Sequence, residues 1–553
     1  MASSSRYLAA HASSSQSHHF KDSMSWRTSA GAAFGITGLV LAANCADFLA
    51  SAEGEETTTA PPSPAPRVAE KPLTRRKLAR RNSQRKQKRH YPYVIIGGGT
   101  SSYAAIEAIR QIQPDANILI ISDEPSLPRA DVDDESEFFQ CASLFRVYNE
   151  YRRHISSRLE SEPDAYSAKP ITLLLGRRRL RIDSENRTVL LHDGTSVTYD
   201  KCLLASAGEP REFYVLNSND IPFNLRDKIN TLTKLQHFVD LDEALKDEEI
   251  EHLTVIGGGF LGTELVCSIA DHVKDRMHVS HVMVESGALQ RYIPEYLSRY
   301  LTQKMKVAGI QVVSDRLVTG LQNSNATTSP RSVSVEISGY ESENLETDYV
   351  VLASTHVNPN TTIGEESGLE IDPKHGGVVV NGSFEYMNGL YVAGNLASYY
   401  DPAIGRRRVD RYDHALNSGL LAGQNMALTN QEDNKQQTIY RHQPAFKSEF
   451  HGLGITCEGV GIIDSNLKTV AVWLAERNEA GEIQERTPSS EFRRGIVYYV
   501  QNNEVVGILL WNASEQLQKA RDVVNSKKNI RNVEELATTI LLAPEEWTDI
   551  IQA

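Results

Sequence analysis

Residues 255–266 read VIGGGFLGTELV, a run in which apolar residues enclose three consecutive glycines and a further glycine follows three positions later. LTVI (253–256) predicts a strand before the glycines, and the apolar spacing after them predicts a helix. Gly257, Gly259 and Gly262 therefore fit the G-x-G-x-x-G pattern in its required context between strand and helix. In this pattern a tight turn brings backbone and a helix N-terminus against a pyrophosphate.

An acidic residue follows the next predicted strand. That strand is HVMV (281–284), and Glu285 comes directly after it. A carboxylate at this place accepts hydrogen bonds from ribose hydroxyls and repels a 2′-phosphate, so it favours NAD over NADP. Arg291, further along, carries the opposite charge and makes this preference less sharp.

The same motif occurs earlier, in VIIGGGTSSYAA (94–105). The predicted phosphate-binding turn consists of small residues: Gly97, Gly98, Gly99 and Thr100. Ser102 takes the third motif position and is small enough for close packing of helix against strand. A second apolar run, NILIIS (117–122), ends at Asp123 and Glu124, either of which can accept from ribose hydroxyls.

One such motif is a weak signal, because glycine-rich turns are common, but two in the correct context are specific. We therefore predict two bound dinucleotides, one a flavin and one a nicotinamide. The corresponding fold is α/β, with two Rossmann-like dinucleotide-binding domains.

Further apolar runs end in small or polar residues. KCLLASAG (201–208) predicts a strand, and the small residues at its end would let the backbone lie close to the ring of a ligand. GLYVAGN (389–395) predicts another strand, and Asn395 at its end either bonds a flavin ribityl chain or caps the strand as a turn residue. GIVYYV (495–500) and VVGILLW (505–511) predict a hairpin within a separate C-terminal α+β domain.

The charge of the chain is unevenly distributed. Residues 1–90 carry 14 Lys/Arg and 6 Asp/Glu, a net of +8, whereas residues 91–553 carry 44 and 65, a net of −21. The acidic body argues against a general nucleic-acid binder. The five cysteines include no CxxC pair, which argues against a zinc site and a local redox disulfide and favours buried thiols.

The composition of the first ninety residues predicts a targeting segment followed by a membrane-spanning segment. Residues 1–28 have the composition of a mitochondrial or plastid transit peptide, with a disordered tail as the alternative. Residues 29–46 hold no charge and are just long enough to cross a bilayer core of about 30 Å. A Thr/Pro linker (57–66) follows. The basic run 75–89 is a solvated linker or a contact for lipid, nucleic acid or nuclear import.

Seven motifs, taken in order along the chain, match one family: VIIGGGT, YDKCLLASAGEPR, TVIGGGFLGTEL, IPEYLSRYLTQKMKVAGI, GLYVAGN, GRRRVDRYDHALNSGLLAGQNM and VVGILLWN. Over residues 91–553 the chain resembles the mitochondrial apoptosis-inducing factors. The resemblance implies a glutathione-reductase-like fold, bound FAD, and oxidation of NADH by hydride transfer to the flavin. Without a CxxC pair, electrons would leave to a diffusible acceptor.

The same resemblance implies a place in the cell. It implies anchorage at the inner mitochondrial membrane through residues 29–46, with the body in the intermembrane space. It further implies an import or assembly partner that supports the respiratory chain, a homodimer that forms on reduction, and a nuclear, DNA-associated role in cell death after release.

Residue roles follow from the resemblance by position. Glu264 would lie beside the flavin ring as the candidate catalytic residue, and Glu458 near the nicotinamide, where a surface acid is the alternative. The NAD site would be lined by Phe260, Leu261, Glu285 and Arg291. The FAD site would be formed by Gly97, Gly99, Thr100, Asp123, Glu124 and Asn395.

The chain departs from the family around the flavin. Asp131 and Ser136 replace an arginine and a lysine, and because that lysine pairs with the glutamate matching Glu264, we expect Glu264 to lose its partner. Other replacements occur at Ser206, Ala207, His356, Asn395, Arg411 and Lys447. The glycine motifs are intact, so we expect dinucleotide binding with low turnover. The alternative is a member with an eroded redox site that acts as an assembly or structural partner.

We predict the following division of the chain: residues 1–90 as targeting, membrane and basic segments, 91–215 and 358–439 as the two parts of the FAD-binding domain, 216–357 as the NAD-binding domain, and 440–553 as a dimerisation-like C-terminal domain. No metal site is predicted.

Overall fold

The computed structural model describes the chain from Arg89 to Gln552 with gaps. The described residues are 89–123, 171–177, 179–206, 208–210, 221–232, 235–324, 332–338, 344–353, 357–428, 437–475, 491–529, 533–542 and 548–552. Residues 1–88, which include the predicted transit peptide and membrane segment, lie outside this part. Among the described residues, no helix combines the length and apolarity needed to cross a bilayer.

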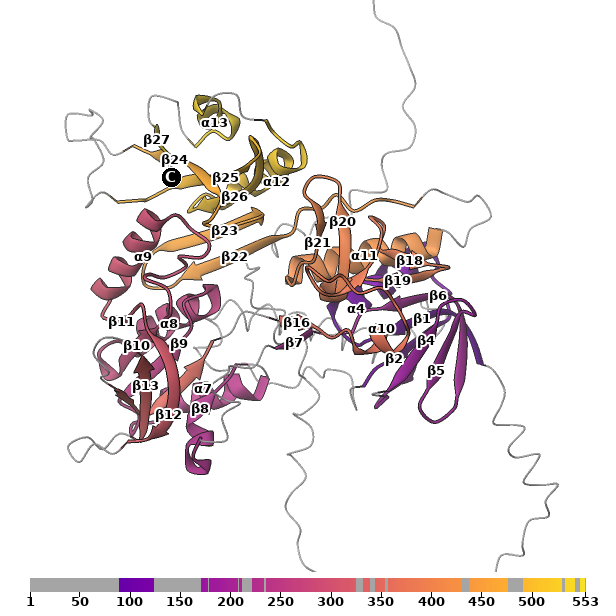
Figure 1. Ribbon diagram of the computed structural model, residues 1–553, viewed down its shortest axis with the longest axis horizontal. Coiled ribbons are helices and arrows are strands. Elements are labelled where there is room, and N and C mark those ends of the chain that lie inside the picture. The colour runs from indigo at the N-terminus through magenta and orange to yellow at the C-terminus, as the bar shows by residue number, and fades with distance from the viewer. Residues whose placement is uncertain are drawn as a thin grey trace, which may run out of the picture.

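An eight-stranded sheet forms around the first glycine motif (Figure 1). Five parallel strands make its centre in the order β3-β2-β1-β6-β19. They are β1 (Arg89–Ile96), β2 (Ile118–Ile121), β3 (Thr172–Leu174), β6 (Ser196–Leu204) and β19 (Leu390–Val392). Antiparallel strands extend the sheet: β4 (Leu180–Asp183), β5 (Thr188–Leu191) and β18 (Glu385–Met387). Strand β19, which is far from β6 along the chain, therefore completes the parallel part of this sheet by pairing with β6.

Helices α4 (Thr100–Ile112) and α11 (Tyr412–Leu428) pack closely against each other. A Cβ atom at Gly419 would lie 2.3 Å from the backbone oxygen of Ser101, and one at Gly423 would lie 2.4 Å from that of Ala105. No side chain fits at either place, so the two glycines let the backbones touch. This contact fixes the N-terminal end of α11 beside the first glycine motif.

A five-stranded sheet forms around the second motif with the order β11-β10-β9-β15-β8, all parallel. Its strands are β8 (Ile229–Asn230), β9 (His252–Ile256), β10 (His278–Val282), β11 (Gln311–Val313) and β15 (Tyr349–Leu352). The helices of this region are η4 (Phe223–Lys228), α7 (Leu235–Lys246), α8 (Phe260–Val273), η5 (Lys274–Arg276) and α9 (Glu295–Val307). Four of these strands, in the order β11-β10-β9-β15, repeat the order β3-β2-β1-β6 of the first sheet, as a second Rossmann-like domain requires. The fifth place differs, because β19 comes last of the five strands along the chain and β8 comes first.

Short sheets complete the two halves. The pair β7 (Gly208–Pro210) and β16 (Val357–Pro359) is antiparallel and lies where the chain passes between the two halves. A meander continues the second half: β12 (Leu317–Asn323), β13 (Val333–Ser338) and β14 (Leu345–Thr347). The first half also contains α10 (Thr362–Glu366), β17 (Val378–Val379), η6 (Gly394–Leu396), β20 (Ala397–Asp401) and β21 (Gly405–Arg407).

The C-terminal region is a six-stranded antiparallel sheet with short helices. Its strands are β22 (Ala445–Phe450), β23 (Ile455–Gly461), β24 (Lys468–Leu474), β25 (Gly495–Gln501), β26 (Glu504–Trp511) and β27 (Thr548–Gln552), and its helices are η7 (Ser514–Gln516), α12 (Leu517–Asn525) and α13 (Glu534–Thr539). The predicted hairpin is β25–β26, and Asn502 and Asn503 turn it with φ of 52° and 62°. The predicted fold class, two Rossmann-like domains and a C-terminal α+β domain, is confirmed.

The C-terminal sheet shares one hydrophobic core with the second half. Buried Phe446, Trp473 and Trp511 belong to the same cluster as Phe260 and other apolar residues of α8. The first half has its own separate core around β1, β6 and β19. The three described cysteines, Cys202, Cys267 and Cys457, are buried free thiols, as expected.

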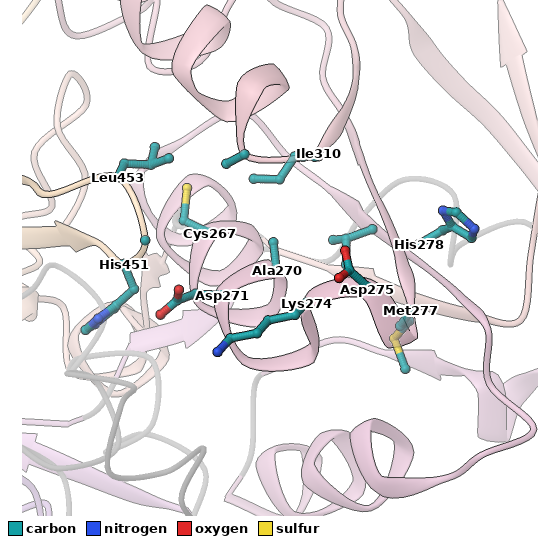
Figure 2. A pocket seen from close by; sticks show the side chains of 14 residues that line it. Cys267, Ala270, Asp271, Lys274, Asp275, Met277, His278, Ile310, His451 and Leu453 are labelled. Carbon is teal, nitrogen blue, oxygen red and sulfur yellow. The ribbon is translucent and has the colours of Figure 1, made fainter.

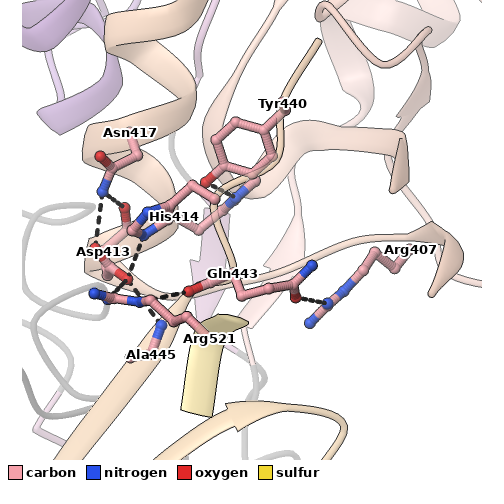
Figure 3. A network of polar contacts seen from close by, with 9 residues as sticks. Arg407, Asp413, His414, Asn417, Tyr440, Gln443, Ala445 and Arg521 are labelled. Carbon is pink, nitrogen blue, oxygen red and sulfur yellow. Dashed lines mark hydrogen bonds and ion pairs between the residues drawn. The ribbon is translucent and has the colours of Figure 1, made fainter. Parts of the chain in front are cut away.

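A polar network joins the first half to the C-terminal sheet (Figure 3). Asp413, in the first turn of α11, accepts from His442 Nε2 at 2.8 Å, Arg521 at 3.1 Å and the Ala445 N–H at 2.8 Å. Burial alone would raise the pKa of Asp413, but these donors and the charges of His442 and Arg521 lower it. The carboxylate stays ionised and links α11, α12 and the start of β22.

Candidate functional site

The first glycine motif forms an open cradle at the carboxyl end of β1. Gly97 has a φ of +112°, and a Cβ there would lie 2.3 Å from the Ala205 backbone oxygen, so the turn accepts only glycine. Gly98 follows, and Gly99 is the N-cap of α4, where a Cβ would meet no atom within 4 Å. Thr100 begins α4 and is buried. The space beside Gly99 is therefore open at the N-terminus of α4, where free N–H groups favour a phosphate.

The acids predicted for the adenosine ribose lie after β2. Asp123 follows Ser122 directly and is exposed at the carboxyl edge of the sheet. Glu124 lies outside the described residues, so its role stays a prediction. Four of the departures from the family, Asp131, Ser136, Ala207 and His356, also lie outside the described residues.

In the first half, the side chain of Asn395 tests whether the site fits a polar ligand. This residue follows Gly394, whose φ is +72° and whose N–H bonds the Ser418 hydroxyl at 2.9 Å. The Asn395 side chain is only 6 % exposed, yet within the described residues neither its Oδ1 nor its Nδ2 has a hydrogen-bond partner. An orphaned buried amide costs about 1–3 kcal/mol, which a bound polar chain would recover. The first site therefore fits FAD.

The second glycine motif is more closely packed. Gly257 has a φ of +130°, and a Cβ there would lie 2.4 Å from the Ala353 backbone oxygen. Gly259 is the N-cap of α8. At Gly262 a Cβ would lie 1.9 Å from the Gly257 oxygen, so the third glycine lets the helix approach the turn. This geometry fits a dinucleotide pyrophosphate.

Glu285 and Arg291 lie together beside the second cradle. The two side chains form an ion pair, in which the Glu285 carboxylate is mostly buried and Arg291 is exposed. The other carboxylate oxygen of Glu285 is 2.8 Å from the position of a Cβ on Gly258. Strand β10 ends at Val282, two residues earlier than predicted, because the chain turns toward solvent at Val284, which is 52 % exposed. Glu285 still reaches the glycine turn.

The residues at the start of α8 that were predicted to line the NAD site are buried. Phe260 is 2 % and Leu261 is 4 % exposed. The Phe260 ring lies 4.6 Å from the Phe446 ring of β22 and 4.8 Å from that of Tyr292. These side chains fix the start of the helix against the C-terminal sheet.

Glu264 has a partner that the sequence did not reveal. The Ser448 hydroxyl of β22 donates to its Oε2 at 2.7 Å, and Glu264 is 6 % exposed. The expectation of an unpaired carboxylate is therefore wrong. Packing of β22 against α8 brings Ser448 to Glu264 across 184 residues of sequence. A lone serine in a strand gives no pattern that could have predicted this contact.

Glu458 is buried, so the alternative of a surface acid is wrong. It is 3 % exposed, and its Oε2 has no hydrogen-bond partner within the described residues. Burial raises the pKa of Glu458, although a Ser514 hydrogen bond and the charges of Lys447 and Arg521 oppose the shift. Lys447 faces Glu458 in the strand register and lies 2.5 Å from Glu449.

Arg411 lies between the first half and the C-terminal sheet. Its guanidinium carbon is 4.5 Å from the centre of the Phe446 ring, and one terminal nitrogen is buried without a hydrogen-bond partner among the described residues. Burial, together with the charge of Arg407, lowers the pKa of Arg411 to about 10.

Ser206, another residue that departs from the family, donates a hydrogen bond from its hydroxyl to the Asn360 backbone oxygen at 3.4 Å. Its neighbour Ala207 lies outside the described part.

His281 is a further polar residue of the second cradle that no motif predicted. Its Nε2 lies 2.8 Å from the Gly257 oxygen, inside the second cradle. Strand β10 reads HVSHV, and its histidines form no spacing pattern that marks a site, so only the structure identifies this contact.

A separate cavity of about 470 Å³ lies at the other end of α8 (Figure 2). Its walls include Cys267, Asp271 and Lys274 of the helix end and His451 of the turn between β22 and β23. Because the glycine cradle is at the N-terminus of α8, this cavity is not the nucleotide site.

Comparison with known proteins agrees with this geometry. Residues 91–419 match the family described as pyridine nucleotide-disulphide oxidoreductase. Residues 475–526 match the C-terminal domain of the mitochondrion-associated apoptosis-inducing factor.

Two relatives identify the group within this family, and one solved structure matches the fold. Apoptosis-inducing factor 1, mitochondrial, of Dictyostelium discoideum is 33 % identical over 81 % of this chain and 81 % of its own. A putative apoptosis-inducing factor 1, mitochondrial, of Drosophila melanogaster is 29 % identical over 81 % of this chain and 65 % of its own. The fold matches a water-forming NADH oxidase of Lactobacillus brevis bound to NADH, with a TM-score of 0.60, 17 % identity, and coverage of 83 % of this chain and 95 % of that one.

The two cradles, the strand order and these matches agree on one assignment. The chain belongs to the pyridine nucleotide-disulphide oxidoreductase family, within the group of apoptosis-inducing factors, and is an FAD-dependent NAD(P)H oxidoreductase.

Proposed function

We propose that this protein is a mitochondrial NADH oxidoreductase of low turnover that supports the respiratory chain and takes part in programmed cell death. The observation that carries the enzymatic part is the pair of glycine cradles, each on a parallel sheet in which four strands have the same order, β3-β2-β1-β6 and β11-β10-β9-β15. The names of the two relatives support the mitochondrial and cell-death parts.

The polarity beside the second cradle supports NADH as the electron donor. Glu285 lies at the position that meets the adenosine ribose, where a 2′-phosphate would be repelled. Arg291, which would attract such a phosphate, is already held in an ion pair with Glu285. NADPH binding would have to break that pair.

The chain's own residues bind, orient and exclude water. The chemistry that a bound FAD would supply is acceptance of a hydride from NADH and transfer of the electrons to an acceptor. The N-termini of α4 and α8 would hold the two pyrophosphates. Ser448 keeps Glu264 in one orientation, and the contact of Phe260 with Phe446 keeps water from the seam between α8 and β22.

A second candidate function is an assembly or structural partner whose redox site is eroded. Its support is the replacement of aromatic and neutral family residues by the cations Lys447 and Arg411 near the seam. Arg411 is stacked on Phe446 with an unsatisfied buried nitrogen, an arrangement that ties it to the protein rather than leaving room for substrate.

Spectra of the purified full chain distinguish the two candidates. The leading proposal predicts a yellow protein whose flavin absorbance bleaches when NADH is added without oxygen, and predicts a weaker response to NADPH. A yellow protein that does not bleach supports the second candidate. A colourless protein that takes up no FAD contradicts both binding assignments.

Location and partners form the remaining part of the proposal. We propose anchorage at the inner membrane through residues 29–46, exposure to the intermembrane space, an import or assembly partner, a homodimer on reduction and relocation to the nucleus on release, with weak nucleic-acid contact through 75–89. The domain boundaries given above belong to the proposal as well. Protease protection of a tagged full chain in isolated mitochondria tests the membrane side, because matrix exposure of the body would contradict it.

A further inference from the structure

A histidine lies inside the second sheet, directly behind the glycine turn. His281 stands on β10 between β9 and β11, opposite Val255 and Val312, and is 0 % exposed. Its Nε2 is 2.8 Å from the Gly257 carbonyl oxygen, and because a carbonyl only accepts, Nε2 carries the proton. Burial lowers the pKa of His281 to about 4, although the bond to Gly257 opposes the shift. The imidazole is therefore neutral at pH 7.

The Gly257 carbonyl is enclosed from two sides. His281 bonds it from the sheet, and the first turn of α8 closes on it from the other side, where a Cβ at Gly262 would lie 1.9 Å away. The Gly257 N–H is also bonded, to the Val282 oxygen at 2.9 Å. Both peptide groups of Gly257 are thus fixed against β10.

The direction of this carbonyl determines where the next N–H points. In a planar trans peptide, the C=O and the following N–H point in opposite directions. With the Gly257 oxygen turned inward to His281, the Gly258 N–H is turned outward, toward the space before the N-terminus of α8. An N–H in that place is a donor for a pyrophosphate oxygen.

In the first cradle, the described residues form no such contact. Its Gly97 N–H bonds the Ile121 oxygen at 2.8 Å, just as Gly257 bonds Val282. The residue that corresponds to His281 is then Ile120, which is buried and apolar. An isoleucine cannot bond a carbonyl, so this hydrogen bond belongs to the second cradle and not to the first.

We propose that His281 is a positioning residue for the nicotinamide nucleotide: its Nε2–H fixes the Gly257 peptide and so orients the Gly258 N–H toward the pyrophosphate. The inference rests on the proposed binding of NADH at the second cradle. Because an oriented donor lowers the ordering cost of binding, its loss weakens NADH binding more than it slows the chemical step.

The test compares flavin-loaded full-length His281→Ile and His281→Gln with the wild type, with NADH as the probe. Isoleucine copies Ile120 of the first cradle, and glutamine keeps an N–H donor. We expect His281→Ile to raise the Kd and KM for NADH about tenfold with kcat changed less than about twofold, and His281→Gln to stay within about threefold of wild type. Flavin content should be equal in all three proteins.

Several results would overturn the inference. They are an isoleucine variant with wild-type KM, a loss confined to kcat, and equal losses in the isoleucine and glutamine variants. A wild-type protein that does not bind NADH overturns the proposed function and this inference with it. If the isoleucine variant does not fold, nitrogen-15 NMR of the wild type decides: an Nε2–H resonance that shifts on addition of NADH supports the role, and an Nδ1–H tautomer contradicts it.

Discussion

The two glycine cradles share the same backbone conformation and differ in which of their polar groups have partners within the protein. Gly97 and Gly257 both have positive φ, and the N–H of each donates to the strand that follows its glycine motif, β2 or β10. In the first cradle the position before α4 is open, and the buried amide of Asn395 has no partner within the described part. In the second, His281 holds the turn and Glu285 is paired with Arg291.

This difference indicates two modes of binding. A cradle with an unsatisfied buried amide gains stability from a ligand that stays, since the ligand supplies the missing hydrogen bonds. A cradle in which the Gly257 carbonyl and the Glu285 carboxylate already have partners suits a ligand that comes and goes, because these groups need not reorder at each exchange. The first fits a resident FAD, and the second fits an exchanging NADH.

Substituting Gly97 by alanine should have the largest effect. The Cβ would lie 2.3 Å from the Ala205 oxygen at a φ of +112°, so both the space and the backbone conformation are lost. We expect destabilisation of about 3 kcal/mol or more and protein without flavin. Flavin absorbance and thermal unfolding measure both.

Gly262→Ala provides the matched comparison in the second cradle. Its Cβ would meet the Gly257 oxygen at 1.9 Å and push α8 away from the turn. We expect flavin to remain bound while NADH binding is lost. Loss of flavin in this variant, or retention in Gly97→Ala, would show that the two cradles do not act separately.

Glu285→Ser should alter the choice of nucleotide. Removal of the carboxylate ends the repulsion of a 2′-phosphate and frees Arg291 from its ion pair. We expect kcat/KM to fall about tenfold for NADH and to rise for NADPH. Steady-state kinetics with both nucleotides measure the change, and Glu285→Ser/Arg291→Ser should lose the gain for NADPH. An unaltered ratio would place the ribose elsewhere.

Asn395→Leu should act in opposite directions on the empty and the filled first cradle. Leucine removes an unsatisfied buried amide, so the flavin-free protein should become more stable by about 1 kcal/mol. FAD, deprived of its partner, should bind about tenfold more weakly, which reconstitution of flavin-free protein measures. Asn395→Asp, which restores the residue of the family, is the control. Unchanged FAD affinity in the leucine variant would contradict a ribityl contact.

The smallest expected effect is the change in protein stability that protonation of His414 causes when the pH falls below neutral. Burial, with the nearby Arg407 and His442, lowers the pKa of His414 to about 3. The unfolded chain takes up this proton near pH 6.5, so the stability is complete above that pH and falls as the pH decreases toward 3. We expect a loss of up to about 1.4 kcal/mol per pH unit from this group. Thermal unfolding between pH 7.5 and 5 should show a smaller slope in His414→Phe, and an equal slope would contradict the assignment.

The local pattern of the chain predicted the cradles well. Glycine spacing and the apolar runs around Gly97 and Gly257 set strand, turn and helix, because these depend on neighbours a few residues apart. The same local logic placed Glu285 beside the turn although β10 ends earlier than expected. It also predicted the β25–β26 hairpin from its turn residues.

The sequence alone therefore determined that two dinucleotide cradles exist, where each begins, and which acid lies beside the second glycine turn. Only the tertiary structure decided that Ser448 donates a hydrogen bond to Glu264 and that His281 bonds the Gly257 oxygen. It also decided that Glu458 is buried and that the Asn395 amide is buried without a partner among the described residues. These environments form where a strand packs against a helix or turn from another part of the chain. Their formation depends on how whole elements pack, which no short stretch of residues encodes.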